Sequence, residues 1–309
     1  MYIKSTVTKV FVSCCSSAFL MEILMTKAPE CATLITFLQA FFISLQGFVF
    51  TTKFGMVKPS IPIKQYIILV LLFFITNVAN NYVYSLHVPS TLHMIIRSAS
   101  SPVSMLVSWY MLNRTPKPTR AVGSVLISAG VALALYGGAT IEQERGTFVY
   151  WCIGVAILLA TLVTGAFTGL QQEMLYAKHG KHPEEMLFYT HALPLVIFLF
   201  ITPHLYNTAL TLDLETWLII ALNIISQFFC TQSVHQLATK ESSVTVTFIL
   251  TLRKFVSLIL SSVVFKNNVT ILHVAGTLLV AVGTYVYFDY FVWKQRPVKY
   301  KQYLIPKLK

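Results

Sequence analysis

Charged residues are scarce in this chain of 309 residues, and acidic residues are the scarcest. Asp, Glu, Lys and Arg together make up 11% of the sequence, against about 25% in an average soluble domain. The chain therefore has too little polar surface to cover a water-soluble globule of this length. A disordered chain is excluded as well, because 56% of the residues are apolar and the mean hydropathy is +0.69.

Cysteine is also sparse, and the number of cysteines is odd. The five are Cys14, Cys15, Cys31, Cys152 and Cys230. No CxxC pair suggests a zinc or redox site. All but Cys31 lie in apolar stretches, where a thiol packs as a small hydrophobic group. We therefore expect buried free thiols, with no disulfide framework, no metal site and no cofactor.

Long apolar runs fill the rest of the sequence. About 20 apolar residues cross a bilayer core as a helix. Ten runs of about this length follow one another: Val7–Met25, Thr33–Thr51, Tyr66–Leu86, Thr91–Leu112, Arg120–Gly137, Phe148–Leu170, Met186–Leu205, Thr216–Leu237, Ser242–Phe265 and Ile271–Phe291. Short breaks with turn or charge signals separate them. The sequence predicts an all-α integral membrane protein with ten transmembrane helices and no soluble domain.

The distribution of positive charge orients these spans. Ten spans place both termini on one side of the membrane. Most of the 23 Lys and Arg residues lie in the tails and loops of that side, and only Lys27, Arg145 and Lys266 lie in loops of the other side. The positive-inside rule places both termini in the cytosol, with residues 294–309 as a basic cytosolic tail. Because the net charge of +12 is spread over short loops, we do not expect nucleic acid as a partner.

Three cations lie inside predicted spans: Arg97, Arg253 and Lys254. Each costs about 2.5–3.5 kcal/mol at the centre of a transmembrane helix. Ion pairs with intramembrane carboxylates could compensate them, but Glu22 is the one well-placed candidate, and one carboxylate cannot neutralise three cations. We therefore favour a hydrated, positively charged cavity that binds an anion. Arg grips two phosphate oxygens at once and Lys adds a compact charge, which suits a diphosphate.

Ser and Thr side chains recur beside these cations at steps of three or four residues, among them Ser104 in the fourth run and Thr251 in the ninth. A polar stripe of this kind can be interhelical packing by small residues or one wall of a water-filled path. The presence of Arg or Lys in each stripe favours the water-filled path.

The two halves of the chain resemble each other. A shift of 153 residues aligns the fourth and fifth runs with the ninth and tenth, and it superposes Gly123 on Gly276 and Gly130 on Gly283. Five spans per half is an odd number, so the halves insert in opposite senses. Inverted repeats around a midplane site are typical of alternating-access transporters. We expect a first five-helix repeat at residues 1–140 and a second at 141–293.

Three segments carry a family resemblance: LHMIIRSAS (Leu92–Ser100), FYTHALPL (Phe188–Leu195) and TVTFILTLRKFVSL (Thr245–Leu258). With them, the chain resembles the nucleotide-sugar transporters of the drug/metabolite transporter superfamily, and most closely the branch that carries UDP-xylose and UDP-N-acetylglucosamine. The resemblance implies the drug/metabolite transporter fold and no enzymatic activity. It implies exchange of cytosolic UDP-N-acetylglucosamine and/or UDP-xylose for lumenal UMP, across a Golgi or endoplasmic-reticulum membrane.

The same resemblance implies roles for individual residues. Arg97, Arg253 and Lys254 would hold the phosphates, and Tyr189 with His191 would bind the nucleotide. Thr190 stands where relatives commonly have Asn, which puts recognition of base or ribose there in question.

Asn80 and Asn81 are candidates for binding the base or the sugar hydroxyls, and packing hydrogen bonds explain such asparagines equally well. Together with Glu22, these residues complete the candidate substrate site, for which we expect no catalytic residue.

Other functions remain as alternatives. The same fold could carry another nucleotide or organic anion, such as ATP/ADP or a sulfated nucleotide. A membrane-embedded glycosyltransferase would need carboxylates for metal or acid–base chemistry, and only Glu22 is deep in the membrane. The lipid bilayer is the remaining partner, and a homodimer is possible.

Overall fold

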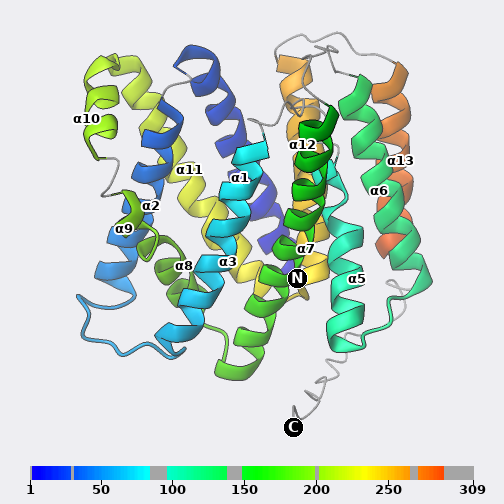
Figure 1. Cartoon of the computed structure of the whole chain (residues 1–309), viewed down its shortest axis with the longest axis horizontal. Coiled ribbons are helices and arrows are strands. Elements are labelled where there is room, and N and C mark those ends of the chain that lie inside the picture. Colours follow the sequence, from blue (N-terminus) through cyan, green and yellow to red (C-terminus); the bar gives the residue numbers. More distant parts are fainter. Residues whose placement is uncertain are drawn as a thin grey trace.

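A computed structural model of the chain describes residues 2–28, 31–83, 96–137, 148–198, 202–264 and 271–288. In that part of the chain all regular structure is helical (Figure 1). The helices are α1 (Tyr2–Lys27), α2 (Ala32–Phe50), α3 (Ile63–Tyr82), α5 (Ser100–Leu112), α6 (Pro118–Gly137), α7 (Phe148–His179), α8 (Pro183–Ala192), α9 (Leu195–Phe198), α10 (Thr202–Thr211), α11 (Leu214–Ala238), α12 (Ser243–Val264) and α13 (Ile271–Phe288). The predicted tail, 294–309, lies outside the described residues.

Where the structure describes the predicted apolar runs, they are helical apart from a break in the seventh, and the prediction of an all-helical membrane protein is confirmed. In the described residues, four helices are long and apolar enough to cross a bilayer: α1, α2, α7 and α11. Most helices stand side by side and run up or down the bundle (Figure 1). A large apolar core lies between α1, α5, α6, α11, α12 and α13.

The seventh run differs from its prediction. Instead of one span over Met186–Leu205, α8 ends at Ala192, a turn follows at Leu193 and Pro194, and α9 is a single short helical turn. Proline has no backbone N–H and its ring clashes with the preceding helical turn, so an interior proline breaks or kinks a helix. Hydropathy detects the apolar length of such a run but does not show the break inside it.

Helices α6 and α13 approach each other at paired glycines. A Cβ atom built on Gly123 would lie 2.7 Å from the carbonyl oxygen of Gly283, and one built on Gly130 would lie 2.7 Å from the carbonyl oxygen of Gly276. Only hydrogen atoms fit at these distances, so the two backbones are in direct contact. Because the earlier glycine meets the later one, α6 and α13 run antiparallel.

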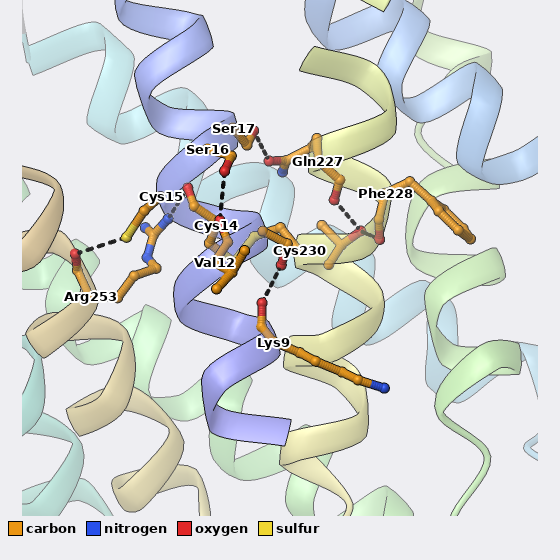
Figure 2. The surroundings of a disulfide bond; sticks show 12 residues. Lys9, Val12, Cys14, Cys15, Ser16, Ser17, Gln227, Phe228, Cys230 and Arg253 are labelled. Atoms are coloured by element: carbon orange, nitrogen blue, oxygen red, sulfur yellow. Dashed lines mark hydrogen bonds between the residues drawn. A yellow bond between two sulfur atoms is a disulfide. The ribbon is translucent and has the colours of Figure 1, made fainter. Parts of the chain in front are cut away.

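Helices α1 and α11 are joined by a disulfide between Cys14 and Cys230 (Figure 2). The expectation that all five cysteines are free thiols is therefore wrong for this pair, while Cys15, Cys31 and Cys152 form no disulfide. The two bonded residues are 216 positions apart. Their spacing in the sequence gives no sign of pairing, since only the packing of α1 on α11 brings the two side chains together.

Candidate functional site

The three cations of the predicted spans come together where α5 packs against α12. Arg97 lies in the helical turn that leads into α5, and Arg253 and Lys254 follow each other on α12. Lys254 experiences the positive charges of both Arg97 and Arg253. We call these three residues the cation cluster.

The partners of the cluster are few. Nη1 of Arg253 donates a hydrogen bond to the carbonyl oxygen of Cys14, at 3.3 Å, while its buried Nε has no partner among the described residues (Figure 2). Arg97 and Lys254 have neither a hydrogen bond nor an ion pair within the described part of the chain. Lys254 is surrounded by protein, yet its side chain is accessible to water. Such a group is ready to receive an anion from solution.

Three of the described carboxylates form ion pairs away from the cation cluster. Ion pairs join Lys27 with Asp213 and Glu215, and Arg114 with Glu173. All of these residues lie near helix ends. These three carboxylates therefore do not neutralise the cation cluster.

Glu22 does not lie beside Arg253. It is on the last turns of α1, about 12 Å along the helix axis from Cys14, whose carbonyl oxygen Arg253 binds. Asn80 is buried, and its Oδ1 accepts a hydrogen bond from Thr161 on α7, at 2.9 Å. This bond fits a packing role for Asn80. The side chain of Asn81 lies outside the described residues.

The serine stripe of α5 serves mainly the packing of α5 against α6. Ser101 and Ser124 share a hydroxyl hydrogen bond at 2.7 Å. Just before α5, Ser98 and Ser128 each donate to the other's carbonyl oxygen. Packing, the alternative for these side chains, therefore accounts for Ser98 and Ser101. On the α12 side, the hydroxyl of Ser100 contacts that of Thr251 at 3.3 Å.

Helix α8 presents an aromatic group. The ring of Tyr189 stacks on Tyr66 of α3, with centroids 4.6 Å apart, and Phe188 meets it edge-on. Nδ1 of His191 lies 2.9 Å from the carbonyl oxygen of Leu187 in the preceding turn. The hydroxyl of Thr190 donates to its own helix, at Met186, 2.7 Å away. The Thr190 hydroxyl is therefore engaged with the backbone of its own helix.

A second polar group, which was not predicted from the sequence, lies in the region of His191. On α11, Nδ1 of His235 lies 3.0 Å from Nε2 of Gln172 and 3.5 Å from the hydroxyl of Tyr176, both on α7. His235 also interacts electrostatically with His191, and α11 packs against α8, so the two imidazoles lie in the same region of the bundle. The sequence did contain one signal of this group: Gln172 and Tyr176 are one helical turn apart, so they lie on the same face of α7. Their partner is on another helix, which one sequence does not reveal.

Two carboxylates near the same end of the bundle were also missed. Glu185 on α8 accepts hydrogen bonds from the backbone N–H of Ile61 and the hydroxyl of Tyr66, at 3.1 and 3.0 Å. Glu173 on α7 accepts a bond from the backbone N–H of Ser243 at the start of α12, at 2.8 Å. Both residues hold helix ends together.

An apolar groove opens between α2, α8 and α9. Its lining residues are Phe41, Ser44, Leu45, Phe48, Phe188, Ala192 and Leu195. None of them is charged, and none belongs to the cation cluster. The groove therefore lacks the chemistry to bind a phosphate.

A helical bundle with membrane-crossing helices defines a class, the multi-pass membrane proteins, and here the bundle contains a cation cluster without a carboxylate partner among the described residues. The family model for the UAA transporter family matches residues 3–290. The chain belongs to the UAA transporter family, so it is a transporter and not an enzyme. This finding excludes the membrane-embedded glycosyltransferase that the sequence had left as an alternative.

Relatives cover nearly the whole chain. A "UDP-xylose and UDP-N-acetylglucosamine transporter" of Danio rerio is 36% identical over 97% of this chain and 97% of its own length. An "Endoplasmic reticulum GDP-fucose transporter" of Drosophila melanogaster is 35% identical, over 90% of this chain and 88% of the relative. A "UDP-N-acetylglucosamine transporter yea4" of Schizosaccharomyces pombe is 32% identical, over 92% and 95%. The resemblance noted in the sequence is confirmed.

The fold also has a counterpart among solved structures. One crystal structure superposes with a TM-score of 0.70 over 96% of this chain and 99% of its own, at 12% sequence identity. At this identity the likeness concerns the fold alone.

Proposed function

We propose that the chain carries UDP-N-acetylglucosamine and/or UDP-xylose from the cytosol into the Golgi or endoplasmic-reticulum lumen, in exchange for UMP. The observation that carries this proposal is the cation cluster, three positive side chains with no carboxylate partner among the described residues. The names of the relatives in zebrafish and fission yeast support a nucleotide-sugar substrate. The fly relative supports the endoplasmic reticulum as one of the two candidate membranes.

The cluster suits a pyrophosphate. Arg97 and Lys254 have no described partner, so a phosphate oxygen would take the place of water at both. Arg253 is held by the Cys14 carbonyl through one of its nitrogens, and its Nε is free among the described residues to turn toward a ligand. A monoanion would leave most of this positive charge without a partner. A diphosphate supplies enough negative charge and several acceptor oxygens.

Ten spans arranged as two inverted five-helix repeats give the scaffold of this proposal. The described helix contacts have the symmetry of such repeats. If each helix is replaced by its counterpart in the other repeat (α1 by α7, α3 by α11, α5 by α12, and the reverse), one observed contact becomes another. The contact α1·α11 becomes α7·α3, and α5·α7 becomes α12·α1. Likewise, the exchange of Gly123 with Gly276 and Gly130 with Gly283 turns one glycine contact between α6 and α13 into the other. This pattern is what a two-fold axis in the membrane plane produces.

With ten spans, both termini face the cytosol, and the two repeats can open the cation cluster to one side at a time. The other predicted site residues belong at the nucleoside end of the substrate, where Tyr189 and His191 lie. Binding must be modest, because a transporter that holds its substrate too tightly does not release it. We keep a homodimer in the proposal as a possible assembly.

Counterflow in proteoliposomes tests the proposal. Vesicles loaded with UMP should take up UDP-N-acetylglucosamine or UDP-xylose faster than empty vesicles. Absence of UMP-stimulated uptake for every nucleotide sugar in a panel would overturn it. The same panel, extended with ATP, ADP and a sulfated nucleotide, tests the alternative cargo on this fold.

A lysine variant tests the cation cluster. Lys254→Ala should lower exchange at least about thirty-fold with unchanged amounts of folded protein, because truncating one member of a buried charge contact typically costs 2–5 kcal/mol. Lys178→Ala, at an exposed lysine at the end of α7, is the matched control and should exchange normally. Wild-type exchange by Lys254→Ala would remove the phosphate role from this residue.

A further inference from the structure

The hydrogen-bond partners of the two neighbouring histidines determine which ring atoms remain available to a ligand. A backbone carbonyl oxygen can only accept, so Nδ1 of His191 donates its proton to Leu187, at 2.9 Å. In the neutral ring, Nε2 of His191 is then an acceptor. The bond from Nδ1 to Leu187 fixes the imidazole of His191 against its own helix. Nε2 therefore remains available to a neighbouring side chain or to a ligand.

His235 has the opposite arrangement. With the amide nitrogen of Gln172 directed toward it, Nδ1 of His235 accepts at 3.0 Å, so its Nε2 carries the proton and is a donor. The same amide nitrogen lies 3.4 Å from the hydroxyl of Tyr176, another acceptor, which supports this orientation of the amide. His191 and His235 thus offer one acceptor and one donor. Both side chains are surrounded by protein, and each keeps part of its surface exposed.

We propose that His191 and His235 read the keto edge of the nucleobase, with His235 as a specificity-determining residue and Gln172 as its positioning residue. In uracil, N3–H would donate to Nε2 of His191 while O4 accepts from Nε2 of His235. Guanine presents the same pair of groups, N1–H and O6. Cytosine and adenine present an acceptor nitrogen beside an amino group, the reverse order, so both hydrogen bonds would be lost.

The depth of the pair fits a nucleoside diphosphate. His235 lies one turn from the end of α11, and Lys254 lies three turns from the start of α12, and residues 239–242 join those two helix ends. At 1.5 Å per residue the two side chains differ in depth by about 12 Å. This is close to the reach from a pyrimidine ring to the second phosphate. A base at the histidines would therefore place its phosphates at the cation cluster.

The named relatives agree with a keto edge rather than with uracil alone. Proteins about equally similar to this chain are named for UDP sugars and for GDP-fucose. Uracil and guanine differ in size but share this edge. The inference rests on the proposed function and narrows it, because it excludes ADP, ATP and CMP-linked sugars as good substrates.

Competition binding on the purified full-length protein tests the inference. Bound radiolabelled UMP is displaced with unlabelled UMP, GMP, CMP or AMP. UMP and GMP should compete well, and CMP and AMP roughly a hundred-fold more weakly, since two hydrogen bonds of about 1–1.5 kcal/mol each are lost. Equal competition by all four nucleotides would overturn base reading and leave nucleotide transport intact. Failure of UMP itself to bind would instead count against the proposed function.

Variants separate recognition from folding. His235→Leu removes one of the two hydrogen bonds and should reduce the preference for UMP over CMP from about a hundred-fold to about ten-fold. His235→Gln keeps an N–H donor and should retain most of the preference. Gln172→Glu can only accept from His235. At a pH where the ring is neutral, this moves the ring proton to Nδ1 and makes Nε2 an acceptor, so CMP should gain relative to UMP.

Gln171→Glu is the matched control for Gln172→Glu, because it makes the same change one residue away on α7. It should keep the wild-type order of nucleotides. An unchanged ratio of UMP to CMP affinity in Gln172→Glu would overturn the inference even if His235→Leu failed to fold.

Discussion

Helix pairs α1–α11 and α5–α12 show opposite ways of treating polar groups inside an apolar bundle. Along α1–α11, Asn223 donates to the carbonyl oxygen of Ser17 at 2.9 Å, and the Ser17 hydroxyl donates to Gln227 at 2.7 Å. The disulfide of Cys14 lies one turn away (Figure 2). Polar groups on this pair therefore have protein partners from the middle of the bundle to its end.

The α5–α12 pair is different. Its helices meet through the hydroxyls of Ser100 and Thr251, while Arg97 and Lys254 have no described partner. The rigid pair α1–α11 thus lies beside a pair, α5–α12, whose cations have no described partner. A binding site needs this arrangement, because partners within the protein would compete with the ligand. The comparison suggests that α1–α11 contributes stability and α5–α12 contributes affinity.

Supplying the missing carboxylate should have the largest effect. In Ser100→Asp the new carboxylate is one turn from Arg97 and opposite Thr251 on α12. We expect nucleotide affinity to fall at least about thirty-fold, because the new charge occupies the cations that a phosphate would use. Thermal stability should rise, since repulsion within the cation cluster decreases. Competition binding and melting temperature measure both effects.

Ser100→Asn is the control for this variant, because it changes size in the same way without adding a charge. It should bind nucleotide far better than Ser100→Asp and should not gain stability. Equal affinities of the two variants would show that the cation cluster is not the phosphate site.

Removing the disulfide between α1 and α11 should have the opposite effect to Ser100→Asp: stability should fall while transport is retained. Cys14→Ser combined with Cys230→Ser should lower the free energy of unfolding by about 2–4 kcal/mol. Exchange per folded molecule should stay within about two-fold of wild type, because Arg253 binds the backbone of Cys14 and not its sulfur. Cys152→Ser, at an exposed free thiol, is the control. A melting temperature that reductant does not change in the wild type would contradict this prediction.

The parts of this comparison were not equally visible in the sequence. Composition and run length predicted the helices, and counting cations inside spans drew attention to Arg97, Arg253 and Lys254. The shift that aligned Gly123 with Gly276 indicated residues that the structure places at a direct backbone contact between α6 and α13. These features depend on hydropathy, charge or local spacing, which a single sequence contains.

Features that depend on two distant helices were not predictable in this way. The partners Cys14 and Cys230, and likewise Gln172 and His235, meet only after the bundle has packed. The sequence also could not show that Ser101 faces Ser124 rather than water. A helical stripe of serines looks the same in both cases, because small hydroxyls suit close helix packing and hydrated surfaces alike.

The ion pair that closes one end of α1–α11 should have the smallest effect, because its groups are exposed to solvent. Hydrogen bonding to Glu215, with help from Asp213, raises the pKa of Lys27. The hydroxyl of Thr216, followed by Lys27, lowers the pKa of the Asp213 carboxyl. The contribution of Asp213 is therefore present above its unfolded-state pKa and is lost as pH falls through the lower folded value. The contribution of Lys27 is lost only as pH rises through a value above 10.5.

Lys27→Gln should lower the melting temperature slightly at pH 7. The difference from wild type should shrink in 1 M salt, where the Debye length is about 3 Å. A difference that persisted in salt would mean that Lys27 stabilises this end by packing rather than by charge. The end of the α1–α11 pair would then be stabilised by packing, as its middle is.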